Sequence, residues 1–203
     1  FRSNRDPLKL AASDLGFALG PRLNAAGRLD DMSVGVALLL CDNIGEARVL
    51  ANELDALNQT RKEIEQGMQA EALTLCEKLE RSGETLPGGL AMYHPEWHQG
   101  VVGILASRIK ERFHRPVIAF APAGDGTLKG SGRSIQGLHM RDALERLDTL
   151  HPGLMIKFGG HAMAAGLSLE EAKFDQFQRL FSELVTDWLD PALLQGEVVS
   201  DGP

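Results

Sequence analysis

The stretch from residue 44 to residue 81 constrains the fold most, because it contains no proline and only two glycines, Gly45 and Gly67. Asn43 precedes it as a helix N-cap, with Glu46 at the third helical position as in a capping box. Such a helix spans roughly 55 Å, more than the width of a small domain, so we predict that it bridges two bodies. Its apolar residues recur in steps of three, four and seven, as on one face of an amphipathic helix: Leu50, Leu54, Leu57, Ile64, Met68, Leu75 and Leu79.

Gly67 leaves an alternative open. A glycine in a helix interior costs roughly 1 kcal/mol relative to alanine and favours a bend. The alternative prediction is two helices that are broken near Gly67.

Beyond Ser82-Gly83, where we expect the long helix to end, runs typical of strands and of helices alternate. We predict strands at 89–94, 115–123, 154–160 and 164–170, a strand or loop at 127–135, and helices at 100–113, 140–150 and 171–189. This alternation indicates an α/β domain with a mostly parallel or mixed sheet. Before the long helix we predict a short helix at 8–19, a turn-rich segment at 20–31 and a buried apolar helix at 33–41.

Composition excludes several classes of protein. A net charge of −7 excludes a uniformly basic nucleic-acid-binding surface, but a local basic groove is compatible with it. Cys41 and Cys76 lie in apolar helical patterns, so we expect buried free thiols; a disulfide is the alternative. No apolar run approaches the ~18 residues of a membrane span, and we expect a cytoplasmic location. The chain starts at Phe1 and stops as a β-like run begins, so we expect a piece of a longer protein.

Four segments are too rich in glycine and polar residues to be plain core: 20–28 (GPRLNAAGR), 94–103 (HPEWHQGVVG), 128–134 (LKGSGRS) and 159–166 (GGHAMAAG). The last two suit an anion, because glycines free backbone N–H groups and Arg133 offers a planar fork for phosphate. The alternative is a pair of tight hairpin turns with solvated charges. Neither segment has the spacing of a phosphate-binding P-loop or a dinucleotide fingerprint.

Histidines occur in two of these segments. His161 is either a core histidine or a group that a ligand approaches past the neighbouring glycines. Pro95 disfavours a helix between His94 and His98, so we expect a strand-to-helix loop with His98 near the helix N-terminus, where anions are favoured. We do not expect a zinc site there. The chain also lacks the Asp/His spacing of a two-metal hydrolase, so it combines phosphate-binding residues with no evident metal site.

The four segments, in this order, resemble those of the RecJ family, single-strand-specific 5′→3′ DNA exonucleases of the DHH/DHHA1 phosphoesterase superfamily. The resemblance rests on GPRLNAAGRLDD, WHQGVVGILASRI, GSGRS and FGGHAMAAG and covers essentially the whole chain. It implies the C-terminal part of a DHH domain at 1–42, a linker helix at 43–84, a DHHA1 domain with a mixed sheet flanked by helices at 85–190, and the start of an OB-like domain at 191–203.

The resemblance also implies a function. The family's Mn²⁺ or Mg²⁺ pair is held by an Asp-His-His signature that this sequence lacks, so we expect no metal on this chain, and no activity from it alone. It implies single-stranded DNA as the substrate, repair and recombination as the setting, and single-strand-binding protein and a helicase as candidate partners. The alternatives are a phosphodiesterase of short RNA or cyclic dinucleotides, and a non-catalytic nucleic-acid-binding module. The predicted substrate-binding residues are Arg22, Asn24, Arg28, His98, Lys129, Ser131, Arg133, Ser134, Gly159, Gly160 and His161.

Overall fold

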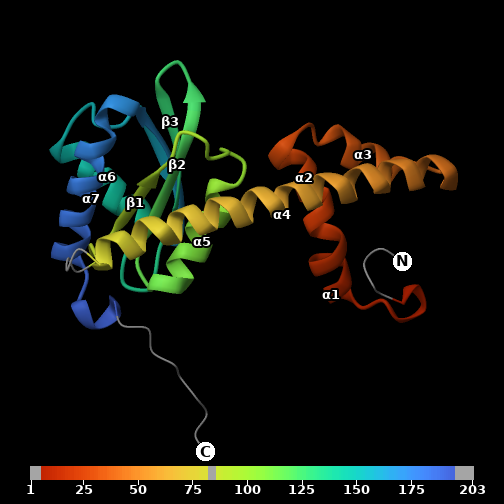
Figure 1. The fold of residues 1–203 in the computed structure, drawn as a ribbon, viewed down its shortest axis with the longest axis horizontal. Coiled ribbons are helices and arrows are strands. Elements are labelled where there is room, and N and C mark those ends of the chain that lie inside the picture. Colours follow the sequence, from red (N-terminus) through yellow and green to blue (C-terminus); the bar gives the residue numbers. More distant parts are fainter. Residues whose placement is uncertain (1–5, 82–85, 195–203) are drawn as a thin grey trace, which may run out of the picture. The chain divides into compact units, whose positions relative to one another are not determined.

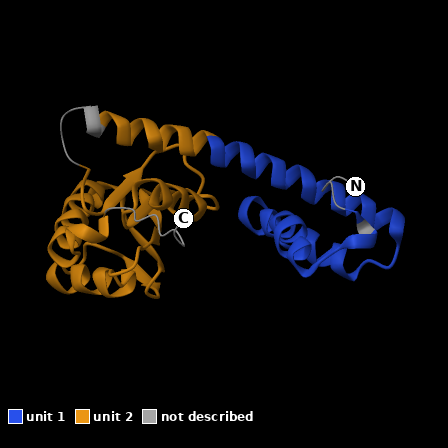
Figure 2. Cartoon of the chain, turned by 90° about the horizontal axis from the view of Figure 1, so that it is seen from below, with its two compact units in different colours: residues 1–66 blue, residues 67–203 orange. Residues whose placement is uncertain are grey.

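The computed structural model describes residues 6–81 and 86–194. The chain divides into two compact units, residues 1–66 (unit 1) and residues 67–203 (unit 2), shown in Figure 2. The boundary falls inside helix α4 (Ile44–Arg81). Among the described helices, none is long and apolar enough to cross a membrane.

The predicted long helix is confirmed. Helix α4 is continuous over 38 residues, so the alternative of two helices broken near Gly67 is wrong. Its N-terminus is capped as the sequence predicts: Asn43 Oδ1 accepts hydrogen bonds from the N–H groups of Gly45 (2.8 Å) and Glu46 (3.2 Å). The predicted stop at Ser82-Gly83 lies outside the described residues.

Replacing Gly67 by alanine is expected to stabilise the chain by about 1 kcal/mol, because alanine loses less backbone entropy in a helix. A Cβ atom at Gly67 would meet nothing within 4 Å, so no steric cost opposes this gain. Gly45→Ala is the control, since a Cβ there would lie 3.1 Å from the capping oxygen of Asn43. Urea unfolding of both variants measures the difference; a destabilised Gly67→Ala variant would contradict a regular helix at this point.

Unit 1 consists of the elements before α4 and the first part of α4, up to residue 66. It contains a 3₁₀ turn η1 (Pro7–Lys9), a short helix α1 (Ala12–Asp14), a π-helical turn η2 (Leu15–Leu19) and helices α2 (Gly20–Leu29) and α3 (Ser33–Leu40). The predicted turn-rich segment is therefore wrong, because residues 20–29 form α2. Pro21 lies in the first turn, where its missing N–H is harmless, and the alanines that follow favour a helix.

Helix α3 exists as predicted but is not buried. Three of its large side chains are exposed, Val36 by 51%, Leu39 by 71% and Leu40 by 76%, while Gly35 is its buried residue. The expectation of burial was wrong because an apolar sequence shows only that a surface is suited to burial. No described element of unit 1 covers these side chains.

Unit 2 contains a mixed sheet, in which Figure 1 labels β1, β2 and β3. The sheet has five strands in the order β1-β2-β3-β5-β4. The strands are β1 (Leu90–Tyr93), β2 (Val117–Gly124), β3 (Thr127–Arg133), β4 (Lys157–Gly160) and β5 (Ala164–Glu170). β1 and β2 are parallel, and the other neighbours are antiparallel. The predicted α/β class with a mixed sheet is confirmed, and the undecided segment at 127–135 forms a strand.

Helices cover the two faces of this sheet unequally. Helices α6 (Met140–Leu150) and α7 (Phe174–Trp188) pack on one face and bury a core that includes Phe120, Leu128 and Phe177. Helix α5 (Val102–Phe113) packs on the other face, against β2 and β3 (Figure 1). A 3₁₀ turn η3 (Glu171–Lys173) precedes α7, and η4 (Pro191–Leu194) follows it.

Both cysteines are free, as predicted, but only Cys76 is fully buried. Cys41 is partly exposed, and its Sγ donates to the carbonyl oxygen of Asn43 (3.2 Å). The prediction of two free thiols is therefore confirmed, whereas the predicted burial of Cys41 is wrong.

Candidate functional site

Part of the α5 side of the sheet stays open over β3, β5 and β4. Lys129, Ser131 and Arg133 alternate along β3 with the buried residues 128, 130 and 132, so their side chains face away from the α6–α7 core. The register extends this surface, because Ser131 pairs with Gly166 on β5, and Gly166 pairs with Gly159 on β4. We call this surface the open face: Lys129, Ser131, Arg133, Ala164, Gly166, Ser168, Lys157 and Gly159.

Arg133 lies at one end of the open face, against the first turn of α5. Its Nη1 donates to the carbonyl oxygen of Gly132 (2.8 Å) and to Ser131 Oγ (3.1 Å). A Cβ atom at Gly103, in the first turn of α5, would lie 3.0 Å from both Arg133 Nη2 and Ser131 Oγ. The absence of a side chain at Gly103 thus brings a guanidinium, a hydroxyl and a helix N-terminus together, and all three favour an anion.

His98 lies in the loop that leads into this helix turn, as predicted. Its carbonyl oxygen accepts hydrogen bonds from the N–H groups of Val101 (2.9 Å) and Val102 (3.2 Å). Its Nδ1 accepts from the N–H of Gly100 (3.1 Å), and the residue is partly buried. These bonds fix the entry into α5, and a direct contact of His98 with a ligand stays a prediction.

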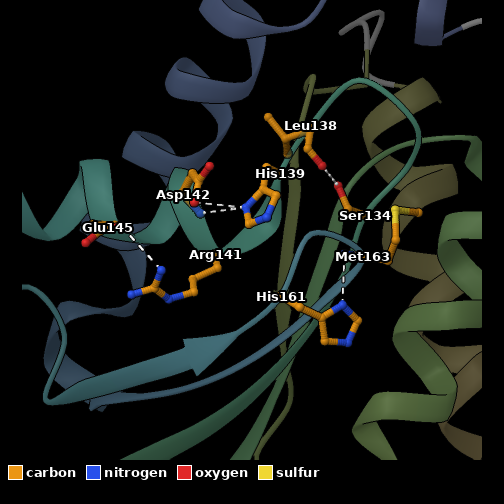
Figure 3. A network of polar contacts seen from close by, with 8 residues as sticks. All are labelled: Ser134, Leu138, His139, Arg141, Asp142, Glu145, His161 and Met163. Atoms are coloured by element: carbon orange, nitrogen blue, oxygen red, sulfur yellow. Dashed lines mark hydrogen bonds and ion pairs between the residues drawn. The ribbon is translucent and has the colours of Figure 1, made fainter.

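His161 lies in the loop between β4 and β5 and is exposed, so the alternative of a core histidine is wrong. Its N–H donates to the carbonyl oxygen of Ala164 (2.8 Å), and its Nδ1 accepts from the N–H of Met163 (3.4 Å; Figure 3). Ala164 is the register partner of Arg133. The loop that carries His161 is therefore next to the end of β3 that carries Arg133.

Ser134 joins the third and fourth glycine-rich segments. Its N–H donates to the carbonyl oxygen of Met163 (2.9 Å), and its hydroxyl donates to that of Leu138 (2.7 Å; Figure 3). The residue is only 1% exposed. These bonds give Ser134 a structural role in holding the His161 loop, and its predicted contact with a ligand stays a prediction.

The two glycines before His161 differ. Gly160 has φ +148°, and a Cβ there would lie 2.5 Å from Ala165 Cα and closer still to the Ala164 carbonyl oxygen, so only glycine fits. A Cβ at Gly159 would meet nothing within 4 Å. Gly160 is thus required by the β4–β5 hairpin, whereas Gly159 leaves open space above the sheet.

A cavity of about 270 Å³ occupies this open space. It is lined by Gly159, Gly166 and Ser168, with Lys129 and Lys157 among its other lining residues. A larger cavity of about 560 Å³, at the opposite edge of the sheet, is lined mainly by apolar side chains that include Leu75, Met92 and Phe174, and by none of the predicted site residues. The smaller cavity is the one on the open face, and its lining includes neither Ser131 nor Arg133.

The remaining predicted residues lie on α2 in unit 1. Arg22 Nε donates to Asp55 Oδ1 (2.8 Å) and its Nη1 to the carbonyl oxygen of Ala18 (2.6 Å), which ties α2 to α4. Asn24 and Arg28 are exposed and four residues apart, so they lie on the same side of α2. This geometry gives Arg22 a structural role and leaves Asn24 and Arg28 as the residues of α2 that a ligand can reach.

Glu71, His94 and Glu96 place three possible ligand atoms within 4.8 Å of one another. Mg²⁺ and Mn²⁺ prefer oxygen ligands in octahedral geometry. Here only three possible ligand atoms converge, and one of them, Glu71 Oε2, already accepts from the indole N–H of Trp97 (2.8 Å). The cluster therefore fits such a metal poorly and serves to hold the β1–α5 loop to α4; that the chain binds no metal stays a prediction.

Sequence reasoning missed four residues of the site: Gly103, Lys157, Gly166 and Ser168. Gly166 and Gly103 belong to segments that the sequence singles out, but their positions beside Arg133 and Gly159 follow from strand register and helix packing. Lys157 and Ser168 carry the signal of polar residues that alternate with apolar ones in strands. That signal predicts a face of the sheet and cannot show whether a helix covers it.

Known proteins resemble this chain in sequence and in fold. Residues 87–187 match the DHHA1 domain family. The chain is 92% identical over 201 residues to "Single-stranded-DNA-specific exonuclease RecJ" of Salmonella typhimurium, and 33% identical over 180 residues to that of Thermus thermophilus. The first match covers 99% of the chain and 35% of the relative, and the second covers 89% and 25%.

Solved structures give the same result. The crystal structure of RecJ from Thermus thermophilus in complex with Mg²⁺ superposes with a TM-score of 0.74 at 34% identity, over 89% of this chain and 27% of that one. The chain spans 35% of the length of the Salmonella relative, about a third. Its near-identity over that third, the DHHA1 match and the shared fold lead to one conclusion: the chain carries a DHHA1 domain and belongs to the RecJ family.

Proposed function

We propose that this chain is the substrate-holding part of a metal-dependent 5′→3′ single-stranded DNA exonuclease. Arg133, Ser131 and the first turn of α5 hold a backbone phosphate, and His161 donates a further hydrogen bond to it. The observation that carries the proposal is the convergence of Arg133, Ser131 and the first turn of α5 at Gly103, where a side chain would displace the guanidinium. The curated relatives' names, which specify single-stranded DNA, support the choice of ligand.

The chemical step needs residues beyond those of this sequence. Relatives have been crystallised with Mg²⁺ or Mn²⁺, and such ions activate a water and neutralise charge on a scissile phosphate. The role proposed for this chain is to position the strand and neutralise its charge. We also propose a cytoplasmic location. On the resemblance alone, we further propose a role in DNA repair and recombination, with single-strand-binding protein and a helicase as partners.

Binding and cleavage by the 203-residue chain test this proposal. A 5′-phosphorylated, labelled oligothymidylate is expected to bind at low salt and to weaken as salt rises, because phosphate contacts release counterions. No nucleotides should be released in Mn²⁺, since the Asp-His-His signature is absent from this chain. Metal-dependent release that disappears in the Arg133→Ala variant would contradict the proposal.

Ligand length separates the two enzymatic readings. Because the open face continues well past Arg133, the chain is expected to prefer a long strand to a dinucleotide. Equal affinity for both would favour a phosphodiesterase of short RNA or cyclic dinucleotides. RNA and DNA oligomers of matched length complete the comparison, with weaker RNA binding expected.

A further inference from the structure

A row of polar side chains crosses the open face at some distance from Arg133. Lys129 on β3 pairs in register with Ser168 on β5, which in turn pairs with Lys157 on β4. Directly paired residues point to the same side of a sheet, and neighbouring strands are about 4.8 Å apart. The two lysines therefore flank Ser168 with their backbones about 10 Å apart; we call this the lysine row: Lys129, Ser168 and Lys157.

The lysine row is positively charged and uncompensated. Among the described residues, neither Lys129 nor Lys157 forms an ion pair or a side-chain hydrogen bond, and both are exposed. The carboxylate that follows on the same face of β5, Glu170, is paired with Lys173 (3.1 Å). Although the chain has a net charge of −7, the two unpaired ammonium groups that line this cavity make it locally positive. They can therefore attract an anion.

The row between the lysine row and Arg133 carries a side chain only on β3, where Ser131 pairs with Gly166. Gly166 and Gly159 complete that row, and a Cβ at Gly166 would lie 4.0 Å from the Gly130 carbonyl oxygen, its nearest neighbour. Lys129 is four residues from Arg133 along β3, which is about 13 Å at the rise of a strand. A single strand with one phosphate at Arg133 thus crosses a flat glycine floor and reaches the lysine row with a later phosphate.

We propose that the lysine row is a second phosphodiester subsite, occupied by the same single strand that Arg133 holds. The assignment rests on the proposed function and adds Lys157 and Ser168 to the residues that contact the substrate. The ammonium groups neutralise a backbone phosphate and the Ser168 hydroxyl donates to it, while the glycine floor lets sugars and bases pass. Contacts of this kind set affinity and register without sequence preference.

Two ligand lengths test the subsite on the 203-residue chain: a 5′-phosphorylated thymidine dinucleotide and a ten-nucleotide oligothymidylate. Lys157→Ala is expected to weaken the ten-nucleotide ligand several-fold and to reduce its salt slope by about 0.7, the value for one phosphate contact of a single strand. It should leave the dinucleotide unaffected, because that ligand ends before the lysine row. Arg133→Ala should weaken both ligands.

Lys78→Ala is the matched control, since it removes the same charge from unit 2 beside the apolar cavity at the opposite edge of the sheet. A Lys157→Ala variant that behaves like Lys78→Ala, or that weakens both ligand lengths equally, overturns the lysine-row subsite and leaves the Arg133 site standing. An Arg133→Ala variant that weakens neither ligand overturns the proposed function and the subsite with it.

Discussion

Replacing Gly160 by alanine is expected to destabilise unit 2 by about 3 kcal/mol, the combined cost of overpacking and a strained backbone. The new methyl group would press on the Ala164 carbonyl oxygen and lie 2.5 Å from Ala165 Cα, and backbone atoms in a sheet have little freedom to move. Urea unfolding should show a lower midpoint with an unchanged slope, since the size of the folded unit does not change.

The neighbouring glycine supplies the control for this prediction. Gly159→Ala should leave the midpoint near that of the parent chain, because its Cβ would meet nothing within 4 Å. The same substitution at adjacent positions thus separates a glycine needed by the hairpin from one that borders the cavity. Equal destabilisation by both variants would contradict the described β4–β5 register.

Replacing Arg133 by alanine is expected to weaken strand binding by roughly ten- to a hundred-fold, the cost of about 1.5–3 kcal/mol for a lost charge-assisted hydrogen bond. His161→Ala should act in the same direction, and in the full-length enzyme kcat/KM should fall by a similar factor. Arg133→Lys should restore only part of the loss, because a point charge cannot replace a planar fork.

Stability separates this reading from a purely structural one. Both residues are at least partly exposed, so the variants should melt close to the parent chain. If the variants instead melt early and the folded molecules bind normally, Arg133 and His161 would be parts of two tight turns and not of a phosphate site. Tm and affinity must therefore be measured on the same preparations.

The long helix, and the alternation of strands and helices in unit 2, were predictable because both depend on the local periodicity of apolar residues. The apolar face of α4 and its Asn43 cap are signals within one element. The strands of unit 2 begin and end within three residues of their predicted bounds. The sequence does not predict helix α2, because the glycine and proline at its start are also typical of a turn. The exposure of Leu39 and Leu40 was missed because periodicity does not show what covers a helix.

The site was only partly predictable for a related reason. The types of residue at Arg133, Ser131 and His161 indicated an anion, and the structure brings the β3 end and the His161 loop together. The convergence at Gly103 depends on how α5 packs on β3, and the different roles of Gly159 and Gly160 depend on strand register. Arg22 was indistinguishable from Arg28 in sequence, although its guanidinium binds Asp55.

Amide chemical shifts during titration of the 203-residue chain with a 5′-phosphorylated oligothymidylate test the central claim most directly. Saturable shifts are expected at the amides around the open face, above all Gly103, Arg133, Gly159, His161 and Gly166. Residues of the apolar cavity, such as Leu75 and Met92, should not respond. Shifts confined to that cavity, or none on the open face at saturation, would contradict the account.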